Sequence, residues 1–199
     1  MQSTVNKIES EIKRRRRGKI YFADDFTSFG TSEAIKKALL RFEKSGMLIR
    51  LAQGIYLYPS MDKRLGLGIL YPSVENIAKE IARRDKARIV PTGLYALNVL
   101  GLSTQVPTNI IFYTDGAPRK IKIYNQFITF KHVVPKNLAY KSEILMLVVS
   151  ALKEIGEQSV TDNDMKLVKQ SISRETKENI LHDIYLAPIW IRNKIQQIL

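Results

Sequence analysis

The sequence of this 199-residue chain predicts an α+β fold with two domains. Near the N-terminus, a helical pattern over residues 31–45 is followed by two short apolar stretches on either side of Gln53 and Gly54, which predicts a helix and then a β-hairpin. Three segments between residues 109 and 133 are rich in β-branched and aromatic residues and predict a small antiparallel sheet. Beyond residue 140, apolar residues recur at helical spacing, so several helices are expected there.

The first domain is expected to span residues 1–60. In chain order we predict a helix over residues 5–17 that Gly18 ends, a strand over 19–22, a short helix and turn over 23–30, a helix over 31–45 and a hairpin over 48–58. In the main helix, Ile35, Leu39 and Phe42 recur at intervals of four and three and form an inward face. Thr31 is a suitable N-cap. This order of elements is typical of a winged helix-turn-helix domain, which binds duplex DNA.

Residues 61–72 are predicted to connect the domains, because Gly66, Gly68 and Pro72 interrupt regular structure there. The second domain is expected to span residues 73–199. It is predicted to contain helices over residues 73–85 and 93–100, strands over 109–114, 120–124 and 127–133, and helices over 141–155, 161–172, 174–185 and 188–199. Thr161 and Asp164 have the spacing of a capping box, and Pro188 suits a first helical position. The apolar helix face over residues 144–152 is expected in the domain core, with an oligomer contact as the alternative.

The net charge of +13 favours a polyanionic partner, because a basic surface attracts phosphates and releases counterions on binding. Residues 1–60 hold 12 Lys and Arg against 6 Asp and Glu, a net +6. Residues 61–199 hold 20 against 13, a net +7 over more than twice the length. The N-terminal domain is therefore the more basic part of the chain.

Candidate DNA-binding residues lie in and beside the predicted helix and hairpin. Lys37, Arg41 and Lys44 repeat the helical spacing on a face other than the apolar one, although an ordinary solvated helix face has the same pattern. The Arg14–Arg17 run is interpreted as a phosphate clamp, with a dimer contact or a solubilising run as alternatives. The full set of candidates is Arg14, Arg15, Arg16, Arg17, Thr31, Ser32, Lys36, Lys37, Arg41, Lys44, Arg50 and Gln53.

The composition argues against most enzyme classes. Cysteine is absent and the only histidines are His132 and His182, so we expect no disulfide, no thiol catalysis, no metal site and no cofactor. Asp115 and Lys131 resemble part of a restriction-type nuclease site, but Thr129 stands where a metal-binding carboxylate is needed. Asp115 is better interpreted as a turn residue. We therefore expect no enzymatic activity.

No stretch of about eighteen uninterrupted apolar residues occurs, and the basic N-terminus does not have the pattern of a secretory signal. We expect a protein of the cytoplasm without a membrane span.

Two segments resemble the AbiEi-type antitoxins, the transcription-repressing half of type IV toxin-antitoxin systems. One is the end of the winged unit, GMLIRLAQGIYLYP, and the other is PTGLYALNVLGLSTQVPTNIIFYTDGAPRKIKI. Gln53 is a difference, since it stands where wings of this family often carry a basic residue. The resemblance, over about residues 1–135, implies a repressor that binds inverted repeats in double-stranded DNA at its own promoter and, through the second domain, counteracts a nucleotidyltransferase-like toxin. Binding of such symmetric DNA as a homodimer would need some contact between two copies of the chain.

Two other functions remain open at this point. The first is a protein-interaction module that uses the same fold without binding DNA, its charge serving only solubility. The second is an RNA-binding protein or a degenerate nuclease.

Overall fold

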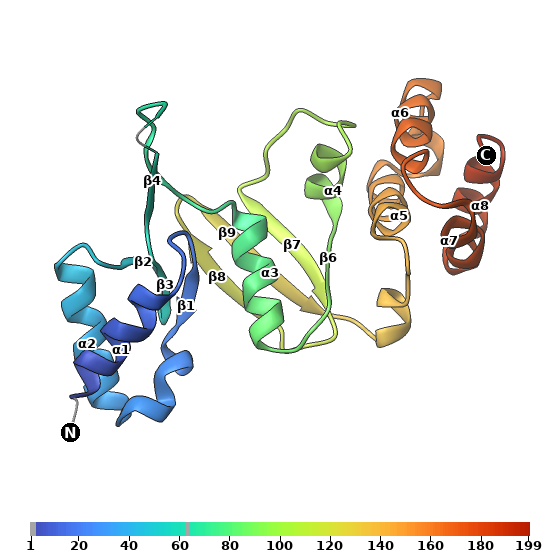
Figure 1. The fold of residues 1–199 in the computed structure, drawn as a ribbon. Helices are drawn as coiled ribbons and strands as arrows, with labels where there is room; N and C mark the ends of the chain where they lie inside the picture. The colour runs from blue at the N-terminus through green and yellow to red at the C-terminus, as the bar shows by residue number, and fades with distance from the viewer. Residues whose placement is uncertain (1–2, 63) are drawn as a thin grey trace. The chain divides into compact units, whose positions relative to one another are not determined.

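The structure is a computed structural model that describes residues 3–62 and 64–199. It is an α+β protein, as expected, in which helices alternate with three small sheets (Figure 1). The chain divides into two compact units after Glu80, a point that lies inside helix α3 (Val74–Arg84). Each unit is described by itself below.

The N-terminal unit contains the predicted order of elements. They are helix α1 (Thr4–Arg14), strand β1 (Ile20–Phe22), the 3-10 helix η1 (Ala23–Phe29), helix α2 (Ser32–Lys44) and strands β2 (Ile49–Ala52) and β3 (Ile55–Leu57). The strands form an antiparallel sheet in the order β1-β3-β2. Helix α2 and the β2–β3 hairpin confirm the helix expected over residues 31–45 and the hairpin after it.

The first helix is shorter than the sequence suggested. It ends at Arg14, because Arg15 adopts an extended backbone with ψ 160°, and Gly18 lies in the loop that follows. The predicted end at Gly18 was therefore wrong. Successive arginines do not stop a helix by themselves, so the signal for this end is absent from local propensity.

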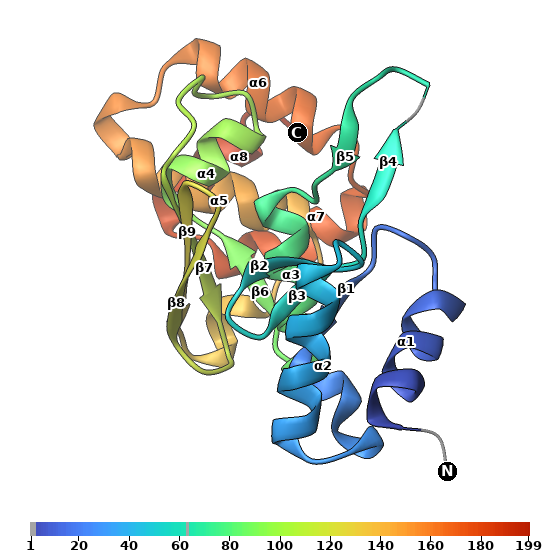
Figure 2. The same cartoon turned by 90° about the vertical axis from the view of Figure 1, so that its left-hand side faces the viewer.

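One hydrophobic core holds the N-terminal unit together. Ile8 and Ile12 of α1 pack with the apolar face of α2 and with Tyr21, Phe26 and Tyr56. Tyr21 and Phe26 stack with ring centroids 5.5 Å apart. The two helices lie beside each other over this core (Figures 1 and 2). Burial of the inner face of α2 leaves its opposite face to solvent.

Two strands that the sequence did not predict occur in and beside the expected connector. Strands β4 (Ser60–Asp62) and β5 (Gly68–Leu70) pair antiparallel, with Met61 opposite Ile69. Lys63, also in this segment, lies outside the described residues. Six large apolar side chains between residues 61 and 71 are exposed: Met61, Leu65, Leu67, Ile69, Leu70 and Tyr71.

The C-terminal unit contains a mixed sheet in place of the expected antiparallel one. Its strands are β6 (Ile89–Pro91), β7 (Asn109–Thr114), β8 (Arg119–Ile123) and β9 (Gln126–His132), in the order β6-β7-β9-β8. Strands β7 and β9 pair in parallel. The prediction of an antiparallel sheet was wrong because β8 takes an edge, where its Lys120 and Lys122 reach solvent, and the more apolar β9 pairs with β7.

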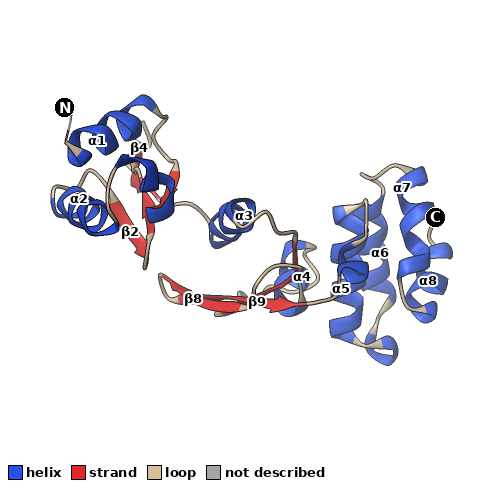
Figure 3. Ribbon diagram, turned by 90° about the horizontal axis from the view of Figure 1, so that it is seen from below, coloured by secondary structure: helices blue, strands red, loops and turns tan. Residues whose placement is uncertain are grey.

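Helices account for the rest of this unit. They are α4 (Gly93–Val99), α5 (Glu143–Ile155), α6 (Asp162–Ile172), α7 (Lys177–Asp183) and α8 (Ile189–Gln196), with short 3-10 helices η2 (Pro135–Leu138), η3 (Glu157–Ser159) and η4 (Ile184–Leu186). Helices α5 to α8 form a group around one apolar core (Figure 3). The Thr161–Asp164 capping box is confirmed, whereas Pro188 is the N-cap of α8 and not its first residue. The apolar face of α5 belongs to this core, as expected.

Candidate nucleic-acid interface

Helix α2 presents two chemically different faces. Ile35, Leu39 and Phe42 are buried, with at most 4% of their surface exposed, and they fix the helix against the core. At about 100° per residue, Lys37, Arg41 and Lys44 fall within roughly 60° of one another on the far side. All three are exposed, and so is Lys36. The structure thus brings four of the candidate cations together on one solvent-facing helix.

The ion pairs of α2 leave most of this positive charge available. Lys37 pairs with Glu33 at 2.7 Å, and both side chains are 77% exposed, so the pair is weak and easily exchanged for another anion. Lys36, Arg41 and Lys44 make no ion pair within the described residues. A ligand phosphate would therefore face little competition for these cations.

The N-terminus of α2 is capped by Thr31. Its hydroxyl oxygen accepts a hydrogen bond from the backbone N–H of Ala34 at 3.3 Å. The hydroxyl proton of Thr31 points to no acceptor among the described residues, and Ser32 is exposed beside it. Both hydroxyls can donate to a ligand, as expected from the sequence.

The β2–β3 hairpin follows α2 closely, since the N–H of Leu48 donates to the carbonyl of Phe42 at 3.1 Å (Figure 2). Gly54 has φ +73° in its turn, a backbone conformation that glycine adopts without strain. Arg50 and Gln53 are both exposed, and Arg50 lies opposite the buried Tyr56. Burial raises the pKa of Tyr56, so its hydroxyl stays protonated. The hairpin therefore offers one cation and one amide to a partner.

The arginine run does not act as one cluster. Arg14 and Arg15 both bind the carboxylate of Glu11, at 2.6 and 3.0 Å. Arg17 donates to the carbonyl of Pro59 at 3.1 Å and lies over the ring of Tyr58. Arg16 is exposed and makes no ion pair or hydrogen bond within the described residues. Of the four, Arg16 is the most available for a phosphate.

Asp115, one of the two residues that suggested a nuclease, is held in structural contacts, as are both histidines, whereas Lys131 is exposed. The Asp115 carboxylate accepts hydrogen bonds from Nε and the backbone N–H of Arg88, at 2.8 and 2.7 Å. The Arg88 guanidinium holds the pKa of Asp115 below its ordinary value. Nδ1 of His132 lies 3.0 Å from the carbonyl of Gly116, and that of His182 lies 2.7 Å from Asp183. The described residues contain no group of three or more His, Asp or Glu side chains that could hold a metal ion.

The structure contains a concavity that was not predicted from the sequence. It lies in the C-terminal unit between α5 and the edge of the sheet, and its volume is about 340 Å³. The part of its lining that comes from α5 has a sequence signal, since Met146, Val149, Ser150 and Lys153 recur at helical spacing. The other lining residues come from distant segments, and no local pattern could have joined them.

The helices formed by the described residues are all too short or too polar to cross a membrane.

The architecture and the exposed cationic helix define an α+β protein with a candidate polyanion-binding surface in its N-terminal unit. The chain belongs to a protein family described as a family of unknown function (DUF6088), which matches residues 7–180. Its structure is similar to the crystal structure of the RV2827C protein from Mycobacterium tuberculosis, with 12% identity and a TM-score of 0.45 over 98% of this chain and 81% of that one. A search of curated proteins gave no match.

Proposed function

We propose that the chain binds duplex DNA through α2 and the β2–β3 hairpin, which act together as a winged helix-turn-helix, and that it represses transcription. The observation that carries this proposal is the exposed cationic face of α2, formed by Lys36, Lys37, Arg41 and Lys44. A helix of this width fits the major groove, and the hairpin that follows it is suited to the neighbouring backbone.

The distribution of contacts supports a division of roles. Arg41 and Lys44 are free to meet phosphates or base edges, and Lys37 can exchange its exposed pair with Glu33 for such a contact. Thr31 and Ser32 offer hydroxyl donors at the start of the helix. Arg16 and Arg50 are exposed cations in the loop before β1 and in the hairpin. They would add sequence-independent contacts to the DNA backbone, which supply affinity but no sequence information.

The resemblance to AbiEi-type antitoxins extends the proposal. On that basis the chain is an antitoxin-like cytoplasmic repressor that binds inverted repeats as a homodimer and counteracts a nucleotidyltransferase-like toxin. A symmetric dimer matches a symmetric site because each subunit meets one half-site. A nucleotidyltransferase-like reading frame next to the gene, whose product is neutralised on co-expression, would support the antitoxin role.

The salt dependence of DNA binding tests whether the proposed interface depends on contacts between cations and phosphates. A dimer that neutralises about 6 to 10 phosphates should lose about a thousandfold or more in affinity between 50 and 200 mM salt. The measurement is a fluorescence-anisotropy titration of the full chain with a labelled duplex from its own promoter. An affinity that hardly changes with salt would contradict the proposed surface.

A protein-interaction module is the second proposed function, and the exposed apolar side chains between residues 61 and 71 favour it. Met61, Leu65 and Leu67 are 60%, 71% and 64% exposed, and such groups of apolar side chains mark contacts between proteins. Absence of binding to the promoter duplex even at 50 mM salt, with retained binding of a protein partner, would support this function over the first.

A further inference from the structure

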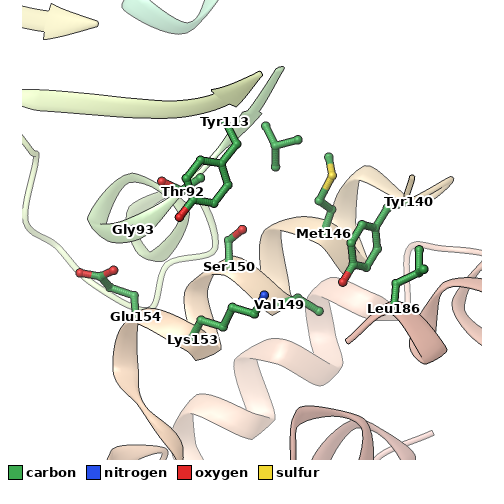
Figure 4. Close-up of a pocket in the computed structure, with 11 residues that line it drawn as sticks. Thr92, Gly93, Tyr113, Tyr140, Met146, Val149, Ser150, Lys153, Glu154 and Leu186 are labelled. Atoms are coloured by element: carbon green, nitrogen blue, oxygen red, sulfur yellow. The ribbon is translucent and has the colours of Figure 1, made fainter. Parts of the chain in front are cut away.

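The cavity of the C-terminal unit has the form of a small-molecule site. Its floor is one stripe of α5, formed by Met146, Val149, Ser150 and Lys153 (Figure 4). One wall is the sheet edge, where Val90 lies opposite Tyr113. The volume of about 340 Å³ lies within the range of about 300 to 1,000 Å³ that is usual for ligand pockets. All of these residues belong to the C-terminal unit, so the cavity does not depend on the N-terminal one.

Apolar side chains supply much of the lining. Val90, Met146, Val149 and Leu186 line the cavity, and the rings of Tyr113 and Tyr140 also face it (Figure 4). Methionine adapts its shape to an apolar body of irregular outline. The cavity can therefore hold a ring or a branched hydrocarbon.

Hydrogen-bond donors complete the lining. The hydroxyls of Tyr113, Tyr140 and Ser150 have no hydrogen-bond partner within the described residues. Burial raises the pKa of Tyr140 to about 12, so its hydroxyl is protonated and can donate at neutral pH. The Thr92 hydroxyl is already engaged with the carbonyl of Ile111 at 3.4 Å. Three polar groups thus remain for a ligand.

The two charges of the cavity lie apart. Lys153 and Glu154 make no ion pair with each other or with any other described residue. The Glu154 carboxylate lies at the Gly93 end, whereas the Lys153 amine extends away from it toward Val149 (Figure 4). An anionic group would be repelled from the Gly93 end and drawn to the amine of Lys153, beside the apolar wall.

We infer that this cavity binds a small organic acid, with its carboxylate at Lys153 and its apolar body against Val90, Met146 and Val149. The site is separate from the proposed DNA surface, and the inference holds whether or not the chain binds DNA. A neutral molecule of the same shape lacks the attraction to Lys153 and binds more weakly.

Methyl NMR provides the test, because the chain has five methionines and Met146 alone among those described lines the cavity. The full-length protein is labelled at the methionine methyl groups, Met146 is assigned with a Met146→Leu variant, and 3-phenylpropionate is added as the probe. The Met146 signal should shift and saturate, while those of Met47, Met61 and Met165 stay in place. An unmoved Met146 signal, or equal shifts of all methionines, would overturn the inference.

A set of matched variants tests the role of the charge. Lys153→Met should weaken binding of 3-phenylpropionate about two- to fivefold, because it removes one exposed ion pair with the probe. Lys153→Arg should keep the affinity, and so should Lys166→Met, which removes an exposed lysine of α6 outside the cavity. Equal binding of the neutral 3-phenylpropionamide, or unchanged affinity in Lys153→Met, would show that the cavity does not select an anion.

Discussion

The guanidinium of Arg17 donates a hydrogen bond to the carbonyl oxygen of Pro59 at 3.1 Å. The same group lies 4.8 Å from the ring centroid of Tyr58, so a cation–π contact accompanies the hydrogen bond. This side chain ties the loop after α1 to the segment that follows β3. A candidate phosphate-binding residue therefore has a structural role, whereas its neighbour Arg16 is exposed without such a contact.

Arg17→Ala should lower the stability of the N-terminal unit by about 1 to 2 kcal/mol, since it removes a charged hydrogen bond and a cation–π contact. Arg16→Ala, the matched control, should change it by less than about 0.5 kcal/mol. The stability of the two variants is compared by amide hydrogen exchange, read at Ile8 and Ile12 in α1 and at Leu57 in β3. Equal protection in the two variants would show that the Arg17 contacts do not stabilise the unit.

Lys37→Ala combined with Arg41→Ala should weaken DNA binding at least tenfold, because two charges of the α2 face are lost. The melting temperature should change little, since the pair between Lys37 and Glu33 is highly exposed. The control is Lys166→Ala with Lys169→Ala, which removes the same charge from exposed positions of α6. DNA-binding titrations and thermal melts of the two double variants measure these effects. Equal loss of DNA affinity in both would indicate a general effect of charge.

Asp183→Ala should destabilise the C-terminal unit by about 3 kcal/mol or more, because it leaves two backbone donors, one of them buried, without a partner. The fully buried carboxylate of Asp183 accepts hydrogen bonds from the backbone N–H groups of Lys141 and Ser142, at 2.6 and 2.7 Å. Asp183→Asn keeps one acceptor oxygen and should therefore lower the stability of the unit by less than Asp183→Ala.

Fluorescence of Trp190, the single tryptophan, follows this unfolding, because that side chain packs against the core of α5 to α8. Asp162→Ala, at an exposed position of α6, is the control. Equal denaturation midpoints for Asp183→Ala and the control would show that the buried carboxylate contributes no stability.

The pKa of Asp115 should lie below its ordinary value of 3.8, mainly because the Arg88 side chain donates a hydrogen bond to the carboxylate. Because the pKa is lower in the folded state than in the unfolded one, this contact stabilises the fold at pH values above the unfolded-state pKa. The stabilisation is lost as the pH falls through the folded-state pKa.

Carboxyl-carbon NMR titration measures the effect. In Arg88→Gln the pKa of Asp115 should rise toward 3.8, whereas Lys86→Gln, at a neighbouring exposed lysine, should leave it low. A pKa that does not respond to Arg88→Gln would contradict the assigned cause.

The sequence alone predicted helix α2 with its N-cap Thr31, its buried face and its cations, and it predicted the hairpin turn at Gly54. These features depend on residues within four positions of each other, and their periodicity is readable without a partner. The Thr161–Asp164 capping box was predictable for the same reason.

Only the tertiary structure decided the features that join distant segments. The parallel pairing of β7 with β9, the contact of Arg17 with Pro59, and the cavity between α5 and the sheet edge each bring together residues from separate segments. Local spacing carries no information on such pairings, because they follow from which surfaces the whole chain can bury. The sequence therefore indicated the exposed cations of α2, whereas the fold determined which arginines of residues 14–17 are held in contacts and where the cavity lies.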